Sequence, residues 1–160
     1  MLTIDKLPQL KLALAQLAKQ SVLVGVPAEK NARKDENDGM NNAQIAYVQD
    51  NGSPAQNIPP RPFMREGVQN IKSKITYHLI KGAKSAIEDG ANPLESLDAT
   101  LHKVGLITQD SIRKRINSNI PPPLSEYTLE KRKERKFKGT KTLIETGQLR
   151  NSINYVIRDN

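Results

Sequence analysis

The feature that most constrains the fold is a pair of long helical patterns separated by a short stop-and-start signal. Residues 64–88 place apolar side chains at helical spacing, and Gly90 ends that pattern. Asn92 is then a strong helix cap, Pro93 suits the first helical position, and a second pattern runs to about Asn117. Two long helices joined by so short a turn predict an antiparallel helical hairpin.

Two segments of alternating side chains predict the strands on which this hairpin packs. Residues 21–27 are apolar on both faces, which is typical of a strand that neighbouring elements cover. Residues 152–158 alternate as in a half-buried strand, and we expect them to pair with residues 22–26. The predicted fold class is α+β: a long antiparallel helical hairpin packed on a small antiparallel β-sheet, with an N-terminal helix and extended loops.

Length and composition set the scale of this fold. A chain of 160 residues is most simply a single domain, residues 1–160, with a core of its own. Only 36% of the residues are apolar and 4% are aromatic, which fits either an ordinary helix-rich domain or a protein that gains part of its stability from partners. Cysteine is absent, so disulfides and thiolate metal sites are excluded and a reducing compartment is favoured.

Residues 1–20 predict a helix and not a targeting segment. Asp5 can cap this helix. Leucines then form one apolar stripe at helical spacing: Leu7, Leu10, Leu14 and Leu17. Lys11, Gln16 and Lys19 interrupt the apolar stretch, so it is neither a signal peptide nor a membrane span. We therefore expect a soluble protein that is made in the cytoplasm and does not contact a membrane.

Two polar regions, residues 28–40 and residues 121–142, are expected to be mobile or partner-contacting excursions from the domain. The first is charged and has no period, and a capping box at Asn41 then opens a short helix that ends at an Asn-Gly pair. The second begins with three prolines that break the regular structure. Ser125 then caps a short basic helix.

Residues 53–63 are predicted to form a stiff strap, because each proline fixes its own φ and pushes the preceding residue toward an extended conformation. The central motif of the strap is Pro59, Pro60, Arg61, Pro62 and Phe63. Such a strap delivers Phe63 to one defined place, where we expect it to fill the core. Near the C-terminus we expect Thr146 to cap a turn, Gly147 to allow a tight backbone and Leu149 to pack inside.

Most of the positive charge lies in one short segment. The chain carries a net charge of +8, and residues 131–141 supply most of it, since this segment contains seven basic residues and a single acidic one, Glu134. The basic residues are Lys131, Arg132, Lys133, Arg135, Lys136, Lys138 and Lys141. Such a segment is either a solvated surface or a contact for an acidic partner, which is nucleic-acid phosphate or an acidic protein subunit. Phe137 is the one aromatic residue within it, so a base-stacking platform is poorly supported.

No residue pattern supports catalysis or a bound metal. The two histidines, His78 and His102, fall on different predicted helices and lack a metal-binding spacing. Residues 35–39 are similar to the start of a calcium loop, but Met40 and Ala46 occupy the positions of its required glycine and glutamate. We therefore predict no enzyme activity, no catalytic or metal-binding residues and no cofactor.

Four segments, in this order, resemble a known protein family. They are VLVGVP at residues 22–27, NAQIA at residues 42–46, IPPRPFMR at residues 58–65 and LIETGQLRNSI at residues 143–153. Together they are similar to the neck or tail-completion proteins of long-tailed bacteriophages and prophages, which are often labelled minor tail or virion morphogenesis proteins. The resemblance covers most of the chain from residue 21 onward, and the helical hairpin between the motifs also fits.

This resemblance implies a structural role in the virion. The chain would join a finished tail to a DNA-filled head as one subunit of a six-fold ring, at the head–tail junction, after synthesis in the host cytoplasm. Its partners would be other copies of itself, the adjacent neck and tail-tube proteins and, non-specifically, the DNA in the channel. For the basic segment an acidic protein is favoured, since a strongly cationic channel wall would retard DNA. The tail terminator of the same junction is the alternative role, and a basic nucleic-acid-binding protein is the alternative of another class.

Overall fold

The computed structural model describes residues 7–33, 39–88 and 93–160 of the chain. The elements in order are α1 (Leu7–Lys19), β1 (Gln20–Gly25), α2 (Asn42–Asn51), α3 (Phe63–Gln69), α4 (Lys72–Glu88), α5 (Pro93–Asn117), α6 (Glu126–Glu134), α7 (Gln148–Ser152) and β2 (Asn154–Asp159), with short 3-10 turns at Ala28–Lys30 and Pro54–Gln56. The described residues therefore form seven α-helices and one small antiparallel sheet, which confirms the predicted mixture of helix and strand.

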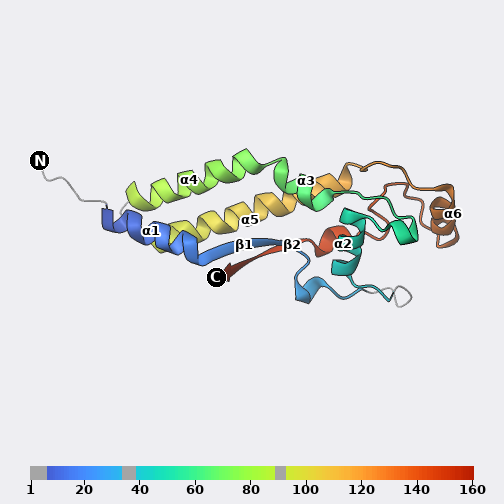
Figure 1. Ribbon diagram of the computed structural model, residues 1–160, viewed down its shortest axis with the longest axis horizontal. Helices are drawn as coiled ribbons and strands as arrows, with labels where there is room; N and C mark the ends of the chain where they lie inside the picture. The colour runs from blue at the N-terminus through green and yellow to red at the C-terminus, as the bar shows by residue number, and fades with distance from the viewer. Residues whose placement is uncertain (1–6, 34–38, 89–92) are drawn as a thin grey trace, which may run out of the picture.

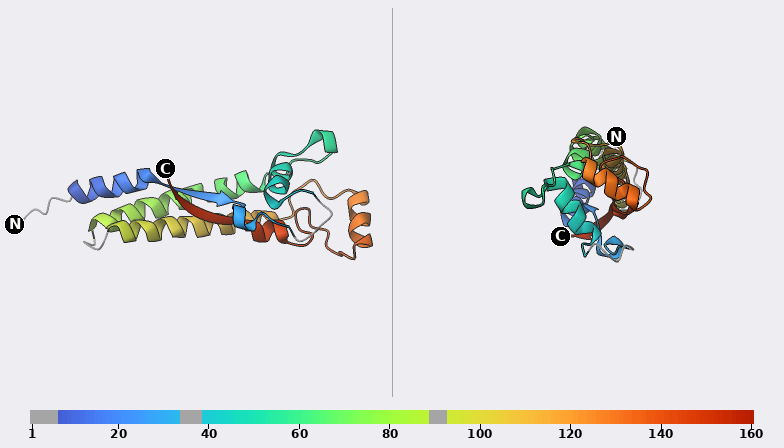
Figure 2. Two further views of the ribbon diagram at one scale, coloured as in Figure 1. Left: turned by 90° about the horizontal axis from the view of Figure 1, so that it is seen from below. Right: turned by 90° about the vertical axis from the view of Figure 1, so that its right-hand side faces the viewer.

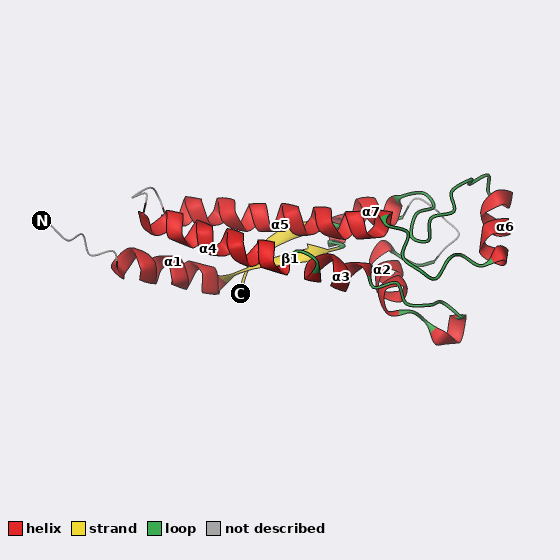
Figure 3. Ribbon diagram, turned by 90° about the horizontal axis from the view of Figure 1, so that it is seen from above, coloured by secondary structure: helices red, strands yellow, loops and turns green. Residues whose placement is uncertain are grey.

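The molecule is elongated, with a helical rod at one end and a region rich in loops at the other (Figure 1). The helices α1, α4 and α5 run along the long axis, and β1 and β2 lie against them (Figure 2). Loops gather at the opposite end, where α6 lies across the axis (Figure 3). We call this region, formed by α2, residues 53–62, α6 and residues 135–147, the loop end. None of the described helices is long and apolar enough to cross a membrane.

The spine of the rod is α5, which contacts α1, α3, α4, α7 and both strands. Its buried side chains follow the predicted apolar stripe: Leu97, Leu101, Val104, Thr108 and Ile112. The helix α4 lies alongside it and runs in the opposite direction (Figure 1). The two backbones approach closely at Gly82, where an added Cβ would stand 2.7 Å from the Cβ of Thr100. Gly90 and Asn92, the predicted stop and cap, lie outside the described residues.

The single helix predicted over residues 64–88 is instead two helices. A turn at Asn70 and Ile71 separates α3 from α4. Asparagine is a poor residue for a helix interior, and the N–H of Ile71 bonds to the carbonyl of Val68, which tightens the last turn of α3. The apolar periodicity continues through this turn, so the pattern of side chains does not reveal the break.

The sheet has two strands among the described residues, and one of its faces is open. β1 pairs with β2 in antiparallel register, with Val24 opposite Tyr155, which confirms the predicted pairing. The face that carries Tyr155 packs on α5, where a Cβ at Gly105 would collide with the ring of Tyr155. Leu23 and Val156 point to the other face, and Leu23 is 45% exposed. The prediction that neighbours cover both faces of β1 is therefore wrong, because apolar side chains on both faces do not show whether a covering element exists.

The main core lies where the rod meets the loop end. It consists of Ala46, Phe63, Ile112, Ile116, Ile120, Leu143, Leu149 and Ile153. Phe63, at the end of the strap, is completely buried as predicted, and burying such a side chain contributes about 1.5–3 kcal/mol. A second, smaller cluster joins Leu17 of α1 to Leu97 of α5. Elsewhere on α1, Leu7 and Leu14 are exposed, so the predicted leucine stripe does not pack as one face.

Local capping signals in the sequence identified several helix ends correctly. Asn41 closes the predicted capping box of α2, and Gly52 ends that helix with a φ of 79°. Ser125 caps α6 through its side-chain oxygen, also as predicted. Asp5, the predicted cap of α1, lies outside the described residues, as do residues 34–38 of the first excursion.

Candidate functional site

The loop end brings together the proline strap, the basic segment and the C-terminal motif. The strap crosses this end beside α2, where the N–H of Arg61 donates to the carbonyl of Gln49 at 2.8 Å. The helix α6 and residues 135–147 lie on the other side of the region (Figures 1 and 3). Segments that are far apart in the sequence thus surround one region, which is the candidate site for contact with a partner.

Six of the seven basic residues between residues 131 and 141 are exposed, and three of the six have internal partners. These contacts are Lys131 Nζ with Glu134 Oε2 (2.8 Å), Arg135 Nη2 with Glu145 Oε1 (3.1 Å) and Lys141 Nζ with the carbonyl of Asn117 (3.2 Å). The ammonium groups of Lys133, Lys136 and Lys138 have no ion-pair or hydrogen-bond partner within the described part of the chain. These three lysines are therefore the cations most open to an external anion.

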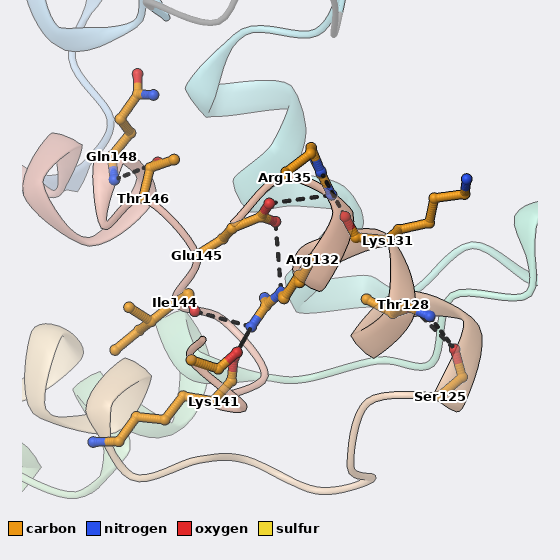
Figure 4. Close-up of polar contacts among 11 residues, drawn as sticks. Ser125, Thr128, Lys131, Arg132, Arg135, Lys141, Ile144, Glu145, Thr146 and Gln148 are labelled. Atoms are coloured by element: carbon orange, nitrogen blue, oxygen red, sulfur yellow. Dashed lines mark hydrogen bonds and ion pairs between the residues drawn. The ribbon is translucent and has the colours of Figure 1, made fainter. Parts of the chain in front are cut away.

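Arg132 is used inside the molecule, where it tethers the loop that follows α6 (Figure 4). Only 4% of it is exposed, and its Nη1 atom donates to three carbonyl oxygens, those of Gly139, Lys141 and Ile144, at 3.0, 2.8 and 3.1 Å. Its Nε atom lies 3.5 Å from Oε2 of Glu145. Burial lowers the pKa of Arg132, while the charge of Glu145 raises it. Arg132 is therefore withdrawn from the predicted contact surface, because the carbonyls of this tight loop take up its donors.

A second arginine is buried near it. Arg61, in the middle of the strap, is 5% exposed, and its Nη2 atom donates to the carbonyl of Pro122 at 2.9 Å. Its Nε atom has no hydrogen-bond partner, and none of the described carboxylates forms an ion pair with it. Burial is the main cause that lowers the pKa of Arg61, and the positive charge of Arg132 adds to it. Arg61 is therefore a buried cation without a counterion in the part of the chain that the structure describes.

Arg61 and Arg132 line a cleft with a volume of about 600 Å³. Ile58 and Pro59 of the strap also line it, together with Leu124, which lies just before α6. An adjoining hollow of about 220 Å³ shares four lining residues with the cleft: Gln49, Arg132, Thr142 and Glu145. The cleft thus combines two buried cations with apolar walls.

The C-terminal motif positions the loop that carries Glu145. Gly147 has a φ of 78°, a left-handed conformation that favours glycine, and it directly precedes α7. Thr146 Oγ1 accepts a long hydrogen bond from the N–H of Gln148 at 3.4 Å, which closes a turn before α7 (Figure 4). The N-cap residue of α7 is Gly147, and no side chain among the described residues caps this helix. Leu149 then enters the main core, which confirms the prediction that it packs inside.

One further polar group lies on the rod, away from the loop end. His102 of α5 has its Nδ1 atom 3.0 Å from the hydroxyl of Tyr155 on β2 and its Nε2 atom 3.5 Å from Asp98. The contact with Tyr155 connects helix α5 to strand β2. Within residues 7–33, 39–88 and 93–160, no group of three or more His, Cys, Asp or Glu side chains could hold a metal ion.

No protein-family model, no curated protein and no solved structure matches the chain. Its function is therefore inferred from the residues and the geometry of the site. The sequence identified the basic segment, but it missed the burial of Arg132 and the position of Arg132 and Arg61 in one cleft. The only signal for Arg61 is that prolines flank it in the strap, and that signal indicates a stiff backbone without indicating burial.

Proposed function

We propose that this chain is a structural protein of a tailed bacteriophage virion that acts at the head–tail junction as a tail-completion or head–tail joining subunit. The order and spacing of the four segments that resemble this family support the proposal. The basic segment at one end of an elongated molecule supports it as well, because such an end can reach a neighbouring layer of an assembly (Figure 1).

The observation that carries the proposal is the amount of large apolar surface left exposed on several faces of the rod. The residues concerned are Leu12 and Leu14 of α1, Leu23 of β1, Tyr77 and Ile80 of α4, and Leu106 of α5. Single exposed apolar side chains are common in monomers, but several on the neighbouring elements α1, β1, α4 and α5 provide apolar surface that another copy can cover. A ring subunit uses two surfaces, since each copy meets its two neighbours through different faces.

In this proposal α4 and α5 act as the predicted helical hairpin, and copies of the chain pack side by side into a six-fold ring. Adjacent neck and tail-tube proteins would stack on that ring. Lys133, Lys136 and Lys138 would contact an acidic surface of an adjoining protein, with the DNA in the channel as a non-specific second contact. The role involves no catalysis and no cofactor, and the protein would reside in the virion after synthesis in the host cytoplasm.

Electron microscopy of lysates from a phage or prophage that lacks this gene tests the proposal. We expect filled heads beside free tails of normal length, because tails would form but not attach. Tails of excessive and irregular length would assign the chain to the tail terminator instead. Intact infectious particles would overturn the virion role, and a nucleic-acid-binding protein would then be tested through the salt dependence of its DNA affinity.

A charge-reversal variant locates the contact within the chain. Lys133→Glu, Lys136→Glu and Lys138→Glu together should abolish head–tail joining while the protein keeps its melting temperature, because these side chains are exposed and have no described internal partner. The matched control is Lys19→Glu, Lys30→Glu and Arg65→Glu, which makes the same change in charge at exposed positions away from the basic segment and from the exposed apolar residues of α4. Equal titres for the basic-segment variant and the wild type would remove this segment from the proposed interface.

A further inference from the structure

The cleft at the loop end has more buried positive than negative charge. Among the described residues, Glu145 is the only acidic one that lines it, and this one carboxylate lies between Arg132 Nε at 3.5 Å and Arg135 Nη2 at 3.1 Å. Arg61, in contrast, forms no ion pair with any described carboxylate and donates from Nη2 to the carbonyl of Pro122 alone. One guanidinium charge in the cleft is thus left without an anion.

An uncompensated buried cation is costly, so its retention needs a physical reason. The burial of Arg61 is not incidental, because the rigid strap fixes its backbone and its N–H is held by the carbonyl of Gln49 at 2.8 Å. Five side-chain atoms of the cleft are buried and form no hydrogen bond with the described residues: Nε of Arg61, Nε of Arg132, Oγ1 of Thr142, Oε1 of Gln49 and Oε1 of Glu145. Arg132 Nε and Glu145 Oε1 already belong to ion pairs. The Arg61 guanidinium and the Thr142 hydroxyl are therefore the donors left for an external acceptor.

We propose that this cleft binds a carboxylate, presented by an aspartate or glutamate side chain of an acidic segment in another protein chain. A guanidinium binds a carboxylate through parallel N–H donors, so Arg61 would act as the main anchor and the Thr142 hydroxyl as an additional donor. The cleft volume of about 600 Å³ accommodates such a side chain together with part of its flanking backbone. Ile58, Pro59 and Leu124 provide apolar walls for its aliphatic portion.

The depth of the site favours a carboxylate over the phosphates of a nucleic acid. Arg61 is 5% exposed and Arg132 is 4% exposed, so a bulky phosphodiester backbone does not reach them, whereas a single side chain does. Residues that bind nucleic-acid phosphates lie on accessible surfaces, as Lys133 and Lys136 do in this chain. The cleft and the exposed lysines are therefore two separate sites for anions. The carboxylate site does not depend on the virion role, and a negative result in the test below leaves that role unaffected.

Titration of the full-length protein with three small compounds tests the site. The Nε–Hε resonance of Arg61 is followed by NMR while N-acetyl-glutamate amide, N-acetyl-glutamine amide or inorganic phosphate is added. We expect saturable binding of the glutamate compound with a dissociation constant on the order of 1 mM, the range of a single weak contact. The neutral glutamine analogue should produce no saturable shift. Phosphate that binds as tightly as the glutamate compound would overturn the assignment to carboxylate, and no saturable shift with any of the three would overturn the site.

Substitutions separate this site from general attraction to a basic protein. Thr142→Val removes a hydroxyl that has no partner and should weaken glutamate binding several-fold without a change in melting temperature. Binding is then measured on Arg61→Gln and on the matched control Lys133→Gln through the remaining side-chain resonances of the cleft. Arg61→Gln should lower the affinity at least tenfold, whereas Lys133→Gln should leave it unchanged. Equal losses in these two variants would show long-range attraction and would overturn a specific site.

Discussion

Replacing Arg132 by alanine tests whether the buried arginine holds the loop end together. Hydrogen bonds from a charged group are worth about 1.5–3 kcal/mol each, but Arg132 Nη1 shares its donors among three carbonyls, so their contributions are less than additive. Removing one member of a fully buried ion pair costs about 3–5 kcal/mol. Glu145 keeps 25% of its side chain exposed, so it regains part of its hydration when Arg132 is removed. We therefore expect the lower end of this range, a loss of about 3 kcal/mol in the free energy of unfolding.

The matched control is Arg135→Ala, because Arg135 pairs with the same carboxylate but is 56% exposed. Exposed pairs contribute about 0–1 kcal/mol, so this variant should remain close to the wild type. Urea denaturation followed by circular dichroism measures both variants, and limited proteolysis should show earlier cleavage between residues 136 and 141 in Arg132→Ala alone. If Arg132→Ala is no less stable than Arg135→Ala, the structural role assigned to Arg132 is refuted.

Other parts of the fold give predictions that the same denaturation assay checks. Phe63→Ala should cost about 3–5 kcal/mol of stability because the ring is fully buried in the main core. The control Tyr127→Ala, at a residue that is 70% exposed, should stay within about 0.5 kcal/mol of the wild type. Similar losses in the two variants would contradict the core position of Phe63. Gly82→Ala should destabilise the protein by about 1–3 kcal/mol despite the better helix propensity of alanine, because the new Cβ meets Thr100. The double variant Gly82→Ala, Thr100→Ala should recover part of this loss. Strictly additive effects of the two substitutions would argue against the contact. Asn41→Ala should cost about 1 kcal/mol by removing the cap of α2, and an unchanged midpoint would show that tertiary contacts alone hold this helix end.

Features set by local chemistry were predictable from the sequence. The cap at Asn41, the cap at Ser125 and the left-handed backbone at Gly147 depend on a few neighbouring residues, and the structure has all three. The burial of Phe63 was also predictable, since a strap stiffened by prolines ends in a single large apolar side chain.

Features set by contacts between distant segments were not predictable in the same way. The turn at Asn70 interrupts a periodic pattern that continues on both sides. Leu23 belongs to an apolar run as a buried residue would, but it is exposed because none of the described elements covers it. Arg132 stands among exposed lysines in the sequence, yet its donors reach carbonyls seven to twelve residues later. Arg132 is buried only because the chain folds back over it as a tight loop, and the composition of the segment does not predict that loop.

Both strands of the sheet are edge strands in the described part of the chain, and this affects how the isolated protein behaves. β1 and β2 each pair on one side only, so each has a free row of backbone N–H and C=O groups beside the apolar pair of Leu23 and Val156. Free edges of this kind recruit further strands, so overexpression without partners favours inclusion bodies and turbidity at high concentration. Leu23→Lys would place a charge that opposes strand association on this face without changing the core. It is therefore the first substitution to make when the isolated protein has to be concentrated.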